Sequence, residues 1–218
     1  KLNRDVALYA ISHPISDLME KYKDLPEVTA YLKEVQEDLV GNLDQFKREP
    51  GAQQQFPFPV SWMREAQFRK YEVNIISDNS TLKGAPVVIE LNPTYGNLFG
   101  KIEKEAQFGA LTTDFTMIIG GSIHKANGGY LVLPVEELVR NLCSYDSLKR
   151  AVKNNEIAIE EAGERLGFIT TKSLDPKPIP LDIKVILIGD PFTYQLLYAY
   201  DPEFKELFKV KADFETRM

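Results

Sequence analysis

The sequence predicts an α/β protein with a parallel β-sheet, and three observations lead to this fold class. The first is a set of short, nearly continuous apolar runs, at 86–91, 130–133 and 183–188. Such runs suit strands that are buried on both faces. The second is that helical stretches, near 135–153 and 192–208, follow the two later runs. The third is a change at Tyr71, where helical spacing gives way to strand-like alternation.

Residues 1–50 are predicted to be helical. Pro14 stands at a suitable first position of a helix, with Ser12 or His13 as its cap. A second helix is predicted to begin at Pro26, because the apolar residues after it recur every three or four positions and share one face. These residues are Val28, Tyr31, Leu32, Val35, Leu39, Leu43 and Phe46. The stripe is either an ordinary core face or a docking surface for a segment outside this sequence.

Residues 51–70 are predicted to form a linker, because prolines and glutamines crowd their first half and forbid a regular element. The chain then changes character. Tyr71, Val73 and Ile75 alternate with polar residues, as on a half-buried strand. Residues 71–218 are therefore expected to hold the α/β domain.

Composition excludes several classes of protein. The 218 residues are 44% hydrophobic, enough for a sizeable core, and the net charge of −6 argues against a general nucleic-acid binder. Cys143 is the single cysteine, so no disulfide within the chain and no cysteine-based zinc site is expected. No run approaches the roughly 20 apolar residues of a membrane span. We therefore expect a cytoplasmic protein with neither nucleic-acid nor membrane partners.

The central motif is a glycine pair that leads into a strand followed by acids. Asn127-Gly128-Gly129 precedes the apolar run 130–133, and Glu136 and Glu137 come shortly after it. In P-loop ATPases the tip of the Walker B strand carries acids that hold magnesium and polarise the attacking water. An ordinary buried strand followed by a helix with glutamates in its first turn would look the same.

The segments around this motif favour the ATPase interpretation. In order they are Asn97-Leu98-Phe99-Gly100, Gly109-Ala110-Leu111-Thr112, Gly121 to Gly129, Ser147 to Val152, Asn155 to Ile159, the strand that ends in Gly189-Asp190, and Phe204 to Val210. This order resembles the AAA+ core shared by Lon, the magnesium chelatases and the enhancer-binding transcription activators. It is most similar to the Lon-related ATP-dependent proteases. The resemblance implies that 71–218 is the second half of a P-loop NTPase-like AAA+ core and that 1–50 ends a helical insertion.

The resemblance also implies roles for five residues. Glu136 and Glu137 lie in the Walker B region, and Asp190 follows the sensor 1 strand, where a carboxylate orients a water or senses the γ-phosphate. Lys205 and Lys209 lie where the family places cations near a neighbouring subunit's nucleotide. Each has a simpler alternative: acids at a helix N-terminus, a turn aspartate, and a solvated helix face.

Two departures from the family pattern bear on the cofactors. Pro134 and Val135 stand where the Walker B acids belong, and neither side chain holds magnesium or polarises water. The sequence also contains no Gly-x-x-x-x-Gly-Lys-Ser/Thr, so it has no phosphate cradle of its own. The resemblance places that cradle upstream. ATP and magnesium are therefore expected in the parent protein, unless it has lost them, and no cofactor is expected to bind this fragment tightly.

A glycine-containing loop is the candidate for substrate contact. Phe108 and Leu111 flank Gly109 and Ala110, and in the resembled ATPases such loops grip a polypeptide in the pore of a ring. The alternative is an ordinary buried loop anchor. The partners implied are protein substrates and further copies in a homo-oligomeric ring.

No catalytic or metal site is assigned within this sequence. The Ser-Lys dyad of the resembled peptidases belongs to a domain beyond Met218. The two histidines, His13 and His124, are too sparse for a histidine metal centre, and His124 is expected to pack or to cap a helix.

The sequence is compatible with three functions. The first is part of the ATPase and unfoldase module of a Lon-like ATP-dependent serine protease, acting in protein degradation. The second is a degenerate AAA+ module that serves as a structural and substrate-recognition platform without hydrolysis, which Pro134 and Val135 favour. The third, a transcription-activator or helicase-like ATPase, fits the acidic charge poorly.

Overall fold

The computed structural model describes residues 2–42, 68–107, 110–141, 143–160 and 174–214. The chain divides into two compact units, Lys1–Glu72 and Val73–Met218. The predicted linker 51–70 lies outside the described residues except for its last three positions.

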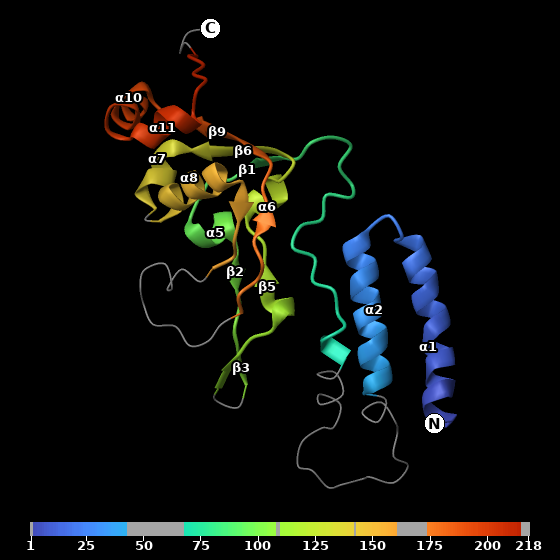
Figure 1. Ribbon diagram of the computed structural model, residues 1–218. Helices are drawn as coiled ribbons and strands as arrows, with labels where there is room; N and C mark the ends of the chain where they lie inside the picture. Colours follow the sequence, from blue (N-terminus) through green and yellow to red (C-terminus); the bar gives the residue numbers. More distant parts are fainter. Residues whose placement is uncertain (1, 43–67, 108–109, 142, 161–173, 215–218) are drawn as a thin grey trace. The chain divides into compact units, whose positions relative to one another are not determined.

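The N-terminal unit contains two packed helices, α1 (Leu2–Lys21) and α2 (Pro26–Gly41) (Figure 1). The prediction that Pro14 begins a helix is wrong, because α1 passes through it. Half-buried or buried side chains lie on both sides of this proline, with Ile15 buried, so packing outweighs the cost of proline inside a helix. Pro26 does begin α2, as predicted.

The predicted apolar stripe of α2 is largely the face that packs in this unit. Val28, Leu32, Val35 and Leu39 are half-buried, whereas Tyr31 is exposed. The remaining two members, Leu43 and Phe46, lie outside the described residues. The described part of the stripe is therefore an ordinary helix–helix contact.

The second unit is built on a parallel sheet of β1 (Val87–Ile89), β6 (Gly129–Pro134) and β9 (Ile183–Ile188), in the order β1-β6-β9 (Figure 1). Helices follow each strand: α5 (Tyr95–Phe99), α6 (Ser122–Ala126), α7 (Val135–Arg140), α8 (Ser144–Asn154), α10 (Pro191–Tyr200) and α11 (Pro202–Leu207). The predicted α/β class, the three strands and their parallel pairing are thus confirmed.

Small antiparallel pairs complete the unit: β2 (Lys101–Ile102) with β5 (Ile118–Ile119), β3 (Glu105–Gln107) with β4 (Ala110–Thr112), and β7 (Glu156–Ile157) with β8 (Ile179–Pro180). The strand predicted from Tyr71 is wrong, because residues 71–75 are not paired in a sheet. Asn74 is the residue held inward, where its amide donates to the carbonyl oxygens of Phe115 and Ile118, both at 2.8 Å. Val73 and Ile75 face outward.

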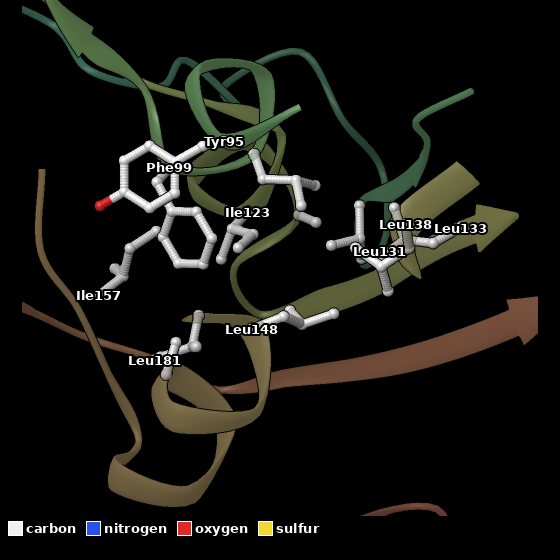
Figure 2. Packing of buried hydrophobic residues seen from close by; sticks show 12 residues of the cluster. Tyr95, Phe99, Ile123, Leu131, Leu133, Leu138, Leu148, Ile157 and Leu181 are labelled. Carbon is white, nitrogen blue, oxygen red and sulfur yellow. The ribbon is translucent and has the colours of Figure 1, made fainter. Parts of the chain in front are cut away.

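The core lies on one face of the parallel sheet. Because β1, β6 and β9 follow one another in a single direction, right-handed crossovers place the connecting helices on the same side. Buried residues from the sheet and these helices pack together there, as Figure 2 shows for Tyr95, Phe99, Ile123, Leu131, Leu133, Leu138, Leu148, Ile157 and Leu181. The opposite face exposes apolar side chains: Val87, Ile89, Tyr130, Ile186 and Ile188.

His124 is buried in α6 and is expected to make stability depend on pH. Its Nδ1 accepts a hydrogen bond from the backbone N–H of Gly121 at 3.2 Å, which confirms the predicted packing and capping role. Burial lowers the pKa of His124 to about 4. Since the unfolded chain takes up this proton near pH 6.5, stability is lost as pH falls from about 6.5 towards 4, by about 2 kcal/mol at pH 5.

Urea unfolding at pH 7 and pH 5 checks this prediction. The carboxylates titrate in both the natural protein and His124→Gln, so the difference between the two losses isolates the imidazole. We expect the smaller loss in the variant. Equal losses would remove His124 as a cause.

Candidate functional site

The candidate site lies at the edge of the sheet where the three parallel strands end. Glu90 directly follows β1, Pro134 is the last residue of β6, and Asp190 comes two residues after β9. In open α/β sheets, ligands bind in the crevice outside the carboxyl ends of the strands. The predicted site residues Glu136 and Asp190 lie at this edge, where they are in contact.

The end of β6 is apolar. Pro134 pairs with Ile188 and is the N-cap of α7, where it makes no side-chain capping bond. Val135 opens α7 and is 4% exposed. Neither side chain carries an oxygen, so the side chains at the tip of this strand cannot hold a magnesium ion.

Glu136 and Glu137 lie in the first turn of α7 but face different partners. The Oε1 atom of Glu136 accepts a hydrogen bond from the backbone N–H of Asp190 at 2.8 Å. Glycine at 189 permits this approach, because a Cβ there would lie 2.5 Å from the same oxygen. Glu137 instead pairs with Arg140 at 2.7 Å. The structure thus brings Glu136, and not Glu137, to the end of β9.

Asp190 is the N-cap of α10. Its Oδ1 accepts hydrogen bonds from the backbone N–H groups of Phe192 at 2.7 Å and Thr193 at 2.9 Å, and its Oδ2 accepts from the Thr193 hydroxyl at 2.8 Å. Hydrogen bonds from the Thr193 backbone and side chain are the main causes that lower the pKa of Asp190 to about 2. The carboxylate is therefore ionised at neutral pH, and both of its oxygens accept hydrogen bonds from the first residues of α10.

The predicted cations lie against aromatic rings or in solvent. The Nζ atom of Lys205 is 4.4 Å from the ring centroid of Tyr198, and Lys209 is exposed. A third cation, Lys211, was missed by the sequence analysis. It lies 4.8 Å from the ring centroid of Tyr194.

Glu90 is a second residue that the sequence analysis missed. Its Oε2 accepts a hydrogen bond from the Ser122 hydroxyl at 2.5 Å, and its Oε1 accepts from the backbone N–H of Asn92 at 2.9 Å. The carboxylate is thus fixed at the end of β1. The signal was available, since Glu90 interrupts an apolar strand run near its end.

One of the two predicted substrate-contact residues, Leu111, belongs to β4 of the β3–β4 pair. Leu111 lies opposite Ala106 in this hairpin and is 71% exposed, which leaves its side chain available for contact. Phe108 lies outside the described residues.

In the part of the chain that the structure describes, no group of three or more His, Cys, Asp or Glu side chains is arranged to hold a metal ion. The helices described here include none with the length and apolar character needed to cross a membrane.

Comparison with known proteins gives a match to a family model. A family model described as "LonB-like, AAA domain" matches residues 83–215, which is more than half of the chain. No match is found among curated proteins. A crystal structure of NtrX from Brucella abortus is similar at 15% sequence identity and a TM-score of 0.37, over 86% of this chain and 43% of that chain. The chain thus spans less than half of that structure, and the likeness is too weak to bear on function.

Proposed function

Because the chain belongs to the LonB-like AAA domain family, we propose that it forms part of the ATPase module of a Lon-like ATP-dependent serine protease and acts in protein degradation. The observation that carries this proposal is the parallel sheet in the order β1-β6-β9, whose carboxyl edge brings the ends of β6 and β9 together. ATP and magnesium are the cofactors proposed for the parent protein, at this edge.

The uncovered side of the sheet supports a core that continues beyond β9. A parallel sheet is normally covered on both faces, yet Ile89, Ile186 and Ile188 are exposed. Among the residues that the structure describes, β9 also has a strand partner on one side only. A further strand beside β9, connected to β1 by a right-handed crossover, would lay a helix over this face. We propose that the upstream part of the parent protein supplies that strand and helix, together with the phosphate cradle.

The apolar end of β6 favours the second candidate function, a platform that recognises substrates without hydrolysing ATP. Pro134 and buried Val135 occupy the positions of the acids, and Glu136 is engaged with the Asp190 backbone. ATP turnover by the full-length protein separates the two candidates. A rate indistinguishable from zero would exclude the unfoldase and leave the platform.

Both candidates share the same partners. Members of AAA families assemble as oligomers, and we propose a homo-oligomeric ring in the cytoplasm that handles protein substrates. In such a ring, Lys205 and Lys209 are proposed to approach the nucleotide of a neighbouring subunit. Phe108 and Leu111 are proposed to contact the substrate in the pore.

Leu111→Ser is expected to weaken processing of protein substrates by the full-length protein several-fold, because it removes an exposed apolar side chain from the β3–β4 hairpin. The free energy of unfolding should change by less than about 0.5 kcal/mol, since the side chain is exposed. Degradation of an unfolded model protein measures the first effect and urea unfolding the second. Leu25→Ser, the same change at an exposed leucine of the N-terminal unit, is the control. Equal processing by the two variants would remove Leu111 from the proposal.

A further inference from the structure

Helix α10 has few apolar attachments to the rest of its unit. None of its residues is buried, and Phe192 and Tyr200 are 70% and 83% exposed. The buried residue of this region is Phe204, which belongs to the next helix, α11. Polar contacts at the two ends of α10 must therefore supply much of its attachment.

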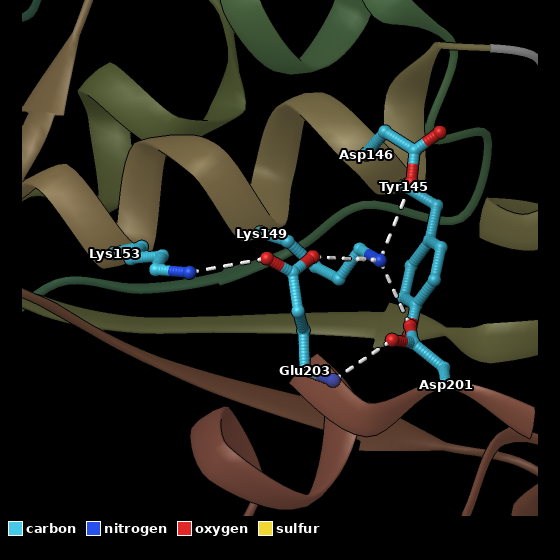
Figure 3. A network of polar contacts seen from close by, with 6 residues as sticks. All are labelled: Tyr145, Asp146, Lys149, Lys153, Asp201 and Glu203. Carbon is cyan, nitrogen blue, oxygen red and sulfur yellow. Dashed lines mark hydrogen bonds and ion pairs between the residues drawn. The ribbon is translucent and has the colours of Figure 1, made fainter.

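The contact at the far end of α10 centres on Asp201 (Figure 3). Its Oδ1 accepts a hydrogen bond from the backbone N–H of Glu203 at 3.0 Å and so begins α11. Its Oδ2 accepts from the Tyr145 hydroxyl at 2.6 Å and from the Lys149 ammonium at 2.9 Å. A single carboxylate thus caps one helix and joins it to another, because Tyr145 and Lys149 belong to α8.

Lys149 is the cation of this contact, and it is largely removed from water. Its side chain is 11% exposed and that of Asp201 is 16% exposed. The same ammonium lies 3.2 Å from Glu203 and 3.3 Å from Asp146, and 4.6 Å from the ring centroid of Tyr145. Removing one partner of such a buried pair leaves an uncompensated charge, so the contact is costly to break from either side.

Aromatic contacts hold α10, α11 and the following residues together. The ring centroids of Tyr194 and Phe204 are 5.8 Å apart, and those of Phe204 and Phe208 are 5.1 Å apart. Lys205 and Lys211 each lie over a tyrosine ring of α10. These contacts are internal to residues 191–211, so they persist if the segment moves as a whole.

We propose that α10 and α11 form one rigid unit, which the ion pair between Lys149 and Asp201 clamps to α8. The Glu136 contact with the Asp190 backbone fixes the other end of this unit. Breaking the clamp releases the unit, together with Lys205 and Lys211, while the parallel sheet stays folded. The clamp is a property of the fold and does not depend on whether ATP is hydrolysed.

Hydrogen–deuterium exchange of the full-length protein tests the clamp. In Lys149→Met, which keeps the length of the side chain but loses its charge, exchange of the backbone amides of α10 and α11 should rise on the order of a hundredfold. Amides of β6 and α6 should exchange as in the natural protein. Lys149→Arg, which restores a cation, should recover most of the protection.

Lys153→Met is the matched control. Lys153 lies on the same helix and pairs with Glu203 at 3.1 Å, but its side chain is 56% exposed, so little change in exchange is expected. If Lys149→Met does not fold, Tyr145→Phe removes one hydrogen bond to Asp201 and is read in the same way. Unchanged protection of α10 and α11, or an equal rise throughout the second unit, would overturn the proposal.

Discussion

Gly121→Ala is expected to destabilise the second unit by about 3 kcal/mol or more. Gly121 is the N-cap of α6 and lies against the end of α5. A Cβ at this position would collide with the carbonyl group of Leu98 and would lie 2.6 Å from the backbone nitrogen of Gly100. These neighbours are backbone atoms, which cannot rotate away as a side chain does, so the two helices would have to separate.

Gly96→Ala provides the control for this prediction. Gly96 lies within α5, and a Cβ there would meet no atom within 4 Å. Alanine loses less conformational freedom in a helix than glycine, so this variant should be as stable as the natural protein or more stable by up to about 1 kcal/mol. Urea unfolding followed by circular dichroism measures both. The steric argument fails if the two variants unfold at the same urea concentration.

Two strands of the parallel sheet were predictable because they are long enough to carry a pattern. The runs at 130–133 and 183–188 became β6 and β9, and helices follow each of them, as predicted. The strand predicted from Tyr71 is wrong because the alternation of apolar and polar residues shows which side chains share a face. It does not show which face is buried. There the side chain of Asn74, rather than those of its apolar neighbours, found partners inside.

The small antiparallel pairs and the site contacts were beyond prediction for a different reason. Strands of only two residues, such as β2 and β7, are too short to show a period. The hydrogen bond between Glu136 and Asp190 joins positions 54 residues apart, and the fold alone brings them together. The sequence identified both residues and the apolar tip between them, but not that Glu136 faces β9 while Glu137 pairs with Arg140.

The apolar tip of β6 leads to the second large prediction, that Pro134→Asp raises ATP turnover of the full-length protein about tenfold or more. Residue 134 lies at the carboxyl edge of the sheet, where an aspartate would offer magnesium the oxygen ligand that proline lacks. The change should also be tolerated by the fold. Position 134 is the N-cap of α7 and makes no side-chain capping bond, and aspartate is among the best residues for that position.

Pro134→Asn tests whether the charge of aspartate, and not its ability to cap α7, raises ATP turnover. Asparagine caps a helix about as well as aspartate, but its amide is neutral and holds magnesium less well. If turnover rises with Asp and not with Asn, the edge of the sheet lacks only a carboxylate. This result would identify the module as a degenerate ATPase. Turnover that stays at background in both variants would mean that this edge does not serve as a magnesium site. If the natural protein already matches Pro134→Asp, then Glu136 or Glu137 replaces the missing acid, and the unfoldase, not the platform, is the function of this module.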